Sequence, residues 1–172
     1  MGYLDPAAGA ARERYSSAGA PGAGANEVQT ITIGGTPTGG TFKLAFEGFV
    51  TAAIAWSATN ATLIANIDAA LEALPSIGTG GVVTAVGTMT AGIGTATVTF
   101  SGGNVAHRAV PTMTVADNSL TGTSPTVAVA ETTPGVAADG RGAASGATLQ
   151  RLDTGALYQN TGTPASPTWT AL

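Results

Sequence analysis

Apolar residues alternate with polar or small residues along most of this chain, and this pattern limits the fold to one dominated by β-strands. Residues 28–33 (VQTITI) are rich in β-branched side chains and end at a glycine pair, which predicts a strand that stops there. The alternation of apolar and polar residues continues over 42–46 and resumes over 50–56. Glu47-Gly48 between these two segments is suited to a tight turn, so we expect a hairpin. Four further strands are predicted between clusters of Gly, Asn, Asp or Pro: 82–86, 95–100, 112–116 and 126–130.

A single segment, residues 60–74, has helical spacing instead. Thr59 or Asn60 is suited to cap its start, and Pro75 ends it. The predicted fold class is therefore mainly β (α+β), an antiparallel sheet or sandwich with one helix packed on a face or edge. The apolar residues of the helix form one stripe: Leu63, Ile64, Ile67, Ala70, Leu71 and Leu74.

Composition divides the chain into four parts. Residues 1–26 are mostly Ala, Gly, Ser and Pro, which cannot offset the entropy of ordering by burial, so we expect an extended arm that docks on something else. Residues 27–133 hold the predicted strands and helix and form a β-rich domain. Residues 134–146 have the composition of a linker. Residues 147–172 predict a β-hairpin unit of two or three strands, too short for a core of its own.

The composition also excludes several classes of function. Gly, Ala and Thr supply 25, 34 and 28 of the 172 residues, and with six basic residues and a net charge of −4 the chain lacks the clustered Lys and Arg that bind nucleic acid. No apolar run approaches the roughly 20 residues that span a bilayer, so no membrane partner is expected. The first residues lack the basic-then-apolar pattern of a signal peptide. Without cysteine the chain cannot form disulfides.

The sequence offers little for catalysis. His107 is the only histidine and has no partner ligands at metal-binding spacing, so we interpret it as a surface or loop residue. Asp68 and Glu72 stand four apart on the predicted helix, opposite its apolar stripe, and are interpreted as solvated. The glycine-rich segments lack phosphate-loop spacing and are expected to be turns. We therefore predict no catalytic residue, no cofactor and no metal, and expect the protein not to be an enzyme.

The arm contains the residues best suited to anchoring it on a partner. Tyr3, Leu4 and Tyr15 are large enough to fill pockets, as interface anchors commonly do. Arg12 and Arg14 can pair with carboxylates on the partner. The small Ala and Gly side chains let a backbone lie along another surface and pair with exposed strand edges. We expect the arm to make the main contact, with the C-terminal unit as the alternative anchor.

Two parts of the chain resemble proteins of tailed phages. Residues 26–33 (NEVQTITI), 39–42 (GGTF), 54–56 (IAW), 69–75 (AALEALP), 96–100 (ATVTF) and 123–127 (TSPTV) together resemble a module of tailed-phage virion proteins. Residues 151–158 (RLDTGALY), 160–163 (NTGT) and 166–170 (SPTWT) are similar to the C-terminal motif of phage head-fibre and capsid decoration proteins. The rest of the N-terminal arm resembles neither group of proteins.

The resemblance implies a structural virion protein, a head fibre or decoration protein, that attaches to the outside of an assembled phage capsid. Its partner would then be the major capsid protein, and its location the outer surface of the virion. The family carries no catalytic residues to transfer. Ordering an arm on binding weakens each single contact, and several linked copies compensate for this. We therefore also expect a homo-oligomer, namely a trimer.

Two other functions stay open. The main alternative is a receptor-binding tail-fibre or surface-adhesion module, in which exposed loops such as residues 102–108 contact host glycans or proteins. The other is a carbohydrate-active fragment that uses Asp68 and Glu72 as paired carboxylates, although the chain has no evident aromatic platform for a sugar. Labelling on the particle separates decoration from the main alternative, since the first predicts label on the head and the second on the tail.

Overall fold

The computed structural model describes residues 12–15, 22, 24–138, 143–151, 154–164 and 166–172, and within them the chain forms ten strands and one helix. The predicted class, mainly β with one helix, is confirmed. The elements are β1 (Arg12–Tyr15), β2 (Val28–Phe46), β3 (Phe49–Val50), β4 (Ile54–Ala55), α1 (Asn60–Glu72), β5 (Val82–Val86), β6 (Gly94–Phe100), β7 (Thr114–Thr133), β8 (Thr148–Arg151), β9 (Leu157–Asn160) and β10 (Trp169–Ala171).

The larger sheet is built around β2, and every strand pair in it is antiparallel. β7 pairs with one edge of β2 from Val28 to Ala45, while β6, β4 and β3 follow one another along its other edge. β5 extends the sheet beyond β6. The predicted hairpin after β2 is confirmed, because β3 and β4 both fold back onto that strand.

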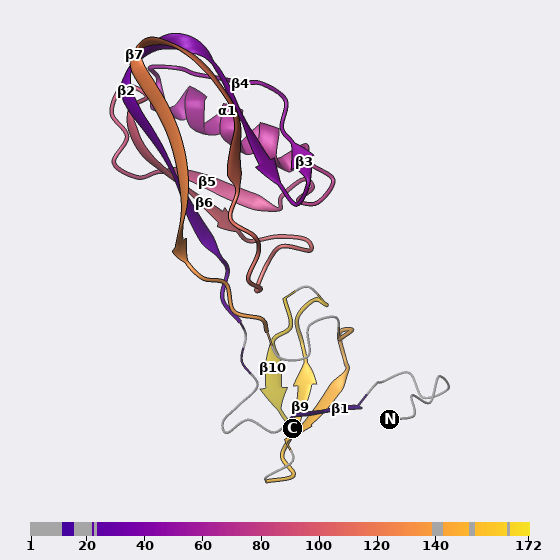
Figure 1. The fold of residues 1–172 in the computed structure, drawn as a ribbon. Helices are drawn as coiled ribbons and strands as arrows, with labels where there is room; N and C mark the ends of the chain where they lie inside the picture. The colour runs from indigo at the N-terminus through magenta and orange to yellow at the C-terminus, as the bar shows by residue number, and fades with distance from the viewer. Residues whose placement is uncertain (1–11, 16–21, 23, 139–142, 152–153, 165) are drawn as a thin grey trace.

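One face of this sheet carries the core, and α1 packs against it (Figure 1). The rings of Phe46 and Phe100 stack there with centroids 5.1 Å apart. The alternation seen in the sequence is the reason, since every second residue of β6, of the first part of β2 and of its last part points to the same face. The apolar residues of the two strands and the helix with no exposed surface are Ile31, Phe42, Leu44, Ala96, Val98, Phe100, Leu63, Ile67 and Leu71.

Two predictions of separate strands are wrong. Residues 28–33 and 42–46 belong to the single strand β2, and residues 126–130 continue from 114–116 within β7. The glycine, proline and asparagine clusters that predicted turns lie inside this long β2–β7 pair, where four shifts of register accommodate them. Gly35 shows why small residues are needed, because a Cβ at this position would lie 2.1 Å from the carbonyl oxygen of Ser124.

The helix begins at Asn60 as predicted and differs from the prediction at its C-terminal end and in its capping. It ends at Glu72, before the predicted 74, and its N-cap Thr59 makes no side-chain capping bond. The side chain of Asn60 instead holds the turn before β6, donating to the Met89 carbonyl over 2.7 Å and accepting from the Gly92 amide over 2.9 Å. No helix in the described part of the chain is long and apolar enough to cross a membrane.

The second sheet is small and has the strand order β1-β8-β9-β10. β8, β9 and β10 form an antiparallel meander, to which β1 adds as a parallel strand. Asn160 organises the meander from a fully buried position. Its Oδ1 accepts from the amides of Gly162 and Thr168, both over 2.9 Å, and its Nδ2 donates to the Ala143 carbonyl over 2.8 Å.

Candidate attachment site

The two sheets lie at opposite ends of the protein (Figure 1). The larger sheet and α1 occupy one end, and the small sheet occupies the other together with the C-terminus. Two segments connect them, and they are tied together where Ala25 and Val136 exchange backbone hydrogen bonds of 2.9 Å. The molecule therefore has two distinct ends, and only one of them includes a strand from the N-terminal arm.

That strand, β1, brings three of the five predicted anchor residues to the small sheet. Arg12, Arg14 and Tyr15 lie in register with residues of β8, in the pairs Arg12↔Thr148, Arg14↔Gln150 and Tyr15↔Arg151. Tyr3 and Leu4 lie outside the described residues. β1 and β10 are the outer strands, so one backbone edge of each has no strand partner among the described residues. Such edges are templates for pairing with another chain.

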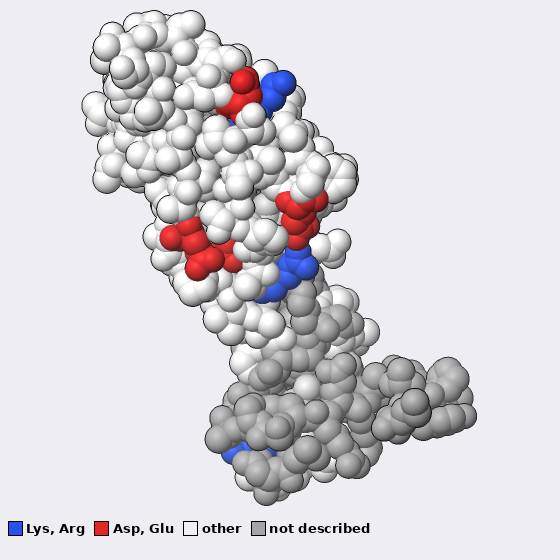
Figure 2. Space-filling view, in the orientation of Figure 1, with Lys and Arg blue, Asp and Glu red and all other residues white. Residues whose placement is uncertain are grey.

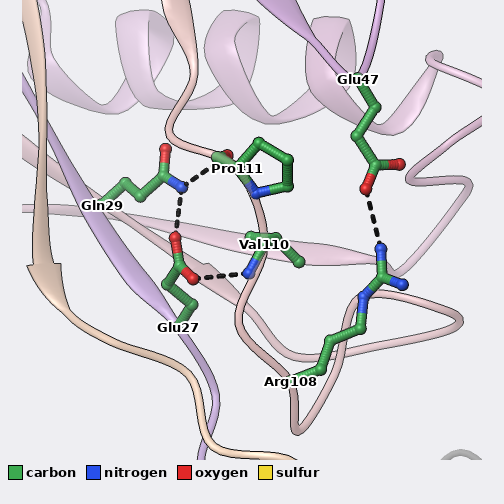
Figure 3. Close-up of polar contacts among 6 residues, drawn as sticks. All are labelled: Glu27, Gln29, Glu47, Arg108, Val110 and Pro111. Carbon is green, nitrogen blue, oxygen red and sulfur yellow. Dashed lines mark hydrogen bonds and ion pairs between the residues drawn. The ribbon is translucent and has the colours of Figure 1, made fainter.

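Buried polar side chains lie at the start of β2, next to the junction between the two ends (Figure 3). Both Glu27 and Gln29 are fully buried. Glu27 accepts from the Val110 amide over 2.7 Å and also from the side-chain amide of Gln29. Gln29 in turn accepts from the Met113 amide over 2.8 Å and donates to the Pro111 carbonyl over 3.1 Å. These bonds fasten residues 110–113 to β2.

The neighbouring residues fasten the preceding loop as well. Asn26 accepts from the His107 amide over 2.9 Å, and Arg108 forms an ion pair with Glu47 over 2.9 Å (Figure 3). Val105 and Ala106 are buried. Within residues 102–108 only Gly103 and Asn104 are exposed, so a recognition role for this loop, which stays a prediction, would depend on these two residues.

His107 is the side chain that joins this loop to the small sheet's end of the molecule. Its Nε2 lies 2.9 Å from the hydroxyl oxygen of Ser166, in the loop between β9 and β10. It is half-buried and has a positive φ of 49°. The prediction of a loop residue is confirmed, but the histidine links two parts of the chain rather than facing solvent.

Asp68 and Glu72 are both partly exposed, in agreement with the prediction, and each also accepts a backbone hydrogen bond that the sequence did not indicate. Asp68 accepts a hydrogen bond of 2.9 Å from the Thr84 amide of β5. Glu72 accepts one of 2.7 Å from the Gly80 amide. Both carboxylates are partly buried and fasten α1 to the segment that leads into β5. These bonds give the pair a structural explanation.

The remaining surface offers little chemistry. Figure 2 shows charged side chains as a few separate patches on a face that is otherwise uncharged. Within the described ranges, no group of three or more His, Asp or Glu residues is placed to hold a metal. A shallow groove lies between α1 and the residues around β4, but alanines line most of it.

Comparison with protein-family models gives no match for this chain, and comparison with curated proteins gives no relative. Asn26, Glu27 and Gln29, which bind the backbone of residues 107–113, were not predicted from the sequence. A signal for two of them was present, because Glu27 and Gln29 are in phase with the buried residues Ile31 and Ile33.

Proposed function

We propose that this protein is a structural virion protein that decorates the outside of a phage capsid, as a head fibre or decoration protein. The observation that carries the proposal is the division into two ends, one of which combines β1 of the N-terminal arm with the C-terminal strands. A decoration protein needs one part that attaches and one part that projects. The resemblance of the C-terminal segments to phage head-fibre and decoration proteins supports the same reading.

The small sheet is the proposed attachment end. The outer edge of β1, which has no strand partner among the described residues, would pair with a strand or extended segment of the major capsid protein. Residues Tyr3, Leu4, Arg12, Arg14 and Tyr15 supply the large and basic side chains that anchor such a contact. The larger sheet then projects from the capsid surface, in a protein that has no catalytic role.

Binding to phage heads assembled without this protein tests the proposal. We compare the full chain with a variant lacking residues 1–15, which removes β1 but keeps the contacts of Ala25 and Asn26. Thr123→Lys, on the exposed part of β7 in the larger sheet, is the matched control. Co-sedimentation should show binding of the full chain and of the control, and loss of binding by the truncated chain.

The other outcomes are informative as well. Undiminished binding by the truncated chain would move the anchor to residues 147–172. If the full chain does not bind heads, the decoration function is wrong. Binding to isolated tails or to host cells instead would favour the receptor-binding alternative.

A further inference from the structure

The pairing of β1 with β8 is unusual for this fold because its strands come from opposite ends of the chain. Four consecutive pairs join them, from Arg12↔Thr148 to Tyr15↔Arg151, and the pair is parallel. The other strand pairs in the described residues are antiparallel. A parallel pair needs a long connection, so it does not form as a local hairpin.

The meander of β8, β9 and β10 leaves an open strand edge wherever β1 is absent. Few of its described residues are buried: Ala147, Leu149, Asn160 and Pro167. A sheet this small is marginal, and an added strand supplies backbone hydrogen bonds that it otherwise lacks. The edge of β8 that faces β1 is therefore a site that accepts a strand.

The segment between β1 and the junction is suited by composition to deliver that strand to a neighbour. Residues 16–24 are Ser, Ala, Gly and Pro. Ala25 is fixed by its bridge to Val136, so these nine residues set the reach of β1. Fully extended they span about 30 Å, enough to cross from one molecule to an adjacent one.

We propose that the β8 edge accepts residues 12–15 of a second copy of this chain, so that neighbouring copies exchange their β1 strands in the oligomer. Exchange preserves every backbone contact of the β1–β8 pair, because the donated strand is identical. The interface of the homo-oligomer would then include the pairing of β1 from one copy with β8 of another. This inference uses the proposed function in one respect: copies that decorate the same capsid would lie close together.

The absence of cysteine from the chain allows a direct test. Arg14→Cys and Gln150→Cys are placed in separate chains of different mass, at positions that are Cα partners in the β1–β8 register. Partners in this register are close enough for a disulfide. The two full-length variants are mixed at high protein concentration and oxidised, and mass spectrometry reads the disulfide that joins the two different chains.

The matched control mixes Arg14→Cys with Thr170→Cys, which lies on β10 at the far edge of the same sheet. A double variant, with both Arg14→Cys and Gln150→Cys in one chain, is oxidised at high dilution to report pairing within a chain. We expect the mixed disulfide between positions 14 and 150 to exceed the control several-fold, and the double variant to close on itself when dilute.

Two results would overturn the proposal. Closure of the dilute double variant, with mixed disulfide no more frequent than in the control, would show that β1 stays in its own chain. Failure to form a disulfide in either experiment would show that the β1–β8 register is wrong. Both readouts use the free protein, so they are independent of whether it binds phage heads.

Discussion

Three polar side chains hold the loops of this protein from fully buried positions: Glu27, Gln29 and Asn160. Each accepts at least one backbone amide that belongs to a loop rather than to a strand ladder. A buried donor or acceptor that loses its partner costs more than the hydrogen bond contributed. These residues are therefore expected to matter for stability without contacting any partner.

Glu27→Ala tests this at the junction. The change leaves the Val110 amide without its acceptor and the side-chain amide of Gln29 with the Pro111 carbonyl alone, so unfolding by denaturant should show a loss of about 2–3 kcal/mol. Glu131→Ala, on the exposed surface of β7, is the control and should stay within about 0.5 kcal/mol of the parent chain. Equal effects of the two changes would contradict the role given to Glu27.

Asn160→Ala tests the small sheet in the same way. Since it unpairs the amides of Gly162 and Thr168, the small sheet should lose about 1–3 kcal/mol. The measurement uses a Trp56→Phe background, in which Trp169 of β10 is the single tryptophan and its fluorescence follows this sheet. Gln159→Ala is the neighbouring control. If both variants lose their Trp169 signal at the same denaturant concentration, Asn160 does not stabilise the small sheet as expected.

At the scale of elements, the β2–β7 pair depends on glycine where the two strands approach most closely. Gly35 has a positive φ of 73°, and a Cβ at this position would lie 2.1 Å from the Ser124 carbonyl oxygen. For both reasons Gly35→Ala should disrupt the pairing of β2 with β7. Gly48→Ala, at φ 84°, meets no atom within 4 Å and should cost only the backbone term of about 1–2 kcal/mol. Denaturant unfolding should therefore give a much lower free energy of unfolding for Gly35→Ala than for Gly48→Ala. A reversed or equal order would contradict the close approach.

The sequence predicted the elements whose signals are local. The strand at 82–86 and the helix start at Asn60 were correct because alternation and helical spacing act within a few residues. The continuity of β2 and β7 could not be predicted in this way. It comes from pairing between positions such as Phe42 and Asn118, and that long-range ladder overrides local turn preferences.

The same limit applies to the candidate site. The five arm residues were chosen for size and charge, and the pairing of β1 with β8 gave no local signal because 132 residues separate Tyr15 from Thr148. The burial of Glu27 depends on Val110, 83 positions away. A charged residue at the start of a strand otherwise suggests solvent exposure.

At the scale of the whole molecule, the larger sheet with α1 has its own core and should fold without the small sheet. A fragment of residues 24–138 keeps the Ala25–Val136 bridge and all of that core. Its circular dichroism should be dominated by β-structure, and it should unfold cooperatively. A spectrum with more helix than sheet, or a transition without cooperativity, would show that this unit is not independent.

The proposed function places the protein on the outside of the phage head, attached by the end that contains the small sheet. Immunogold labelling of intact virions, with antibodies raised against residues 24–138, tests it most directly. The proposed function predicts gold particles distributed over the head and absent from the tail. Gold confined to the tail, or intact particles without any label, would contradict it.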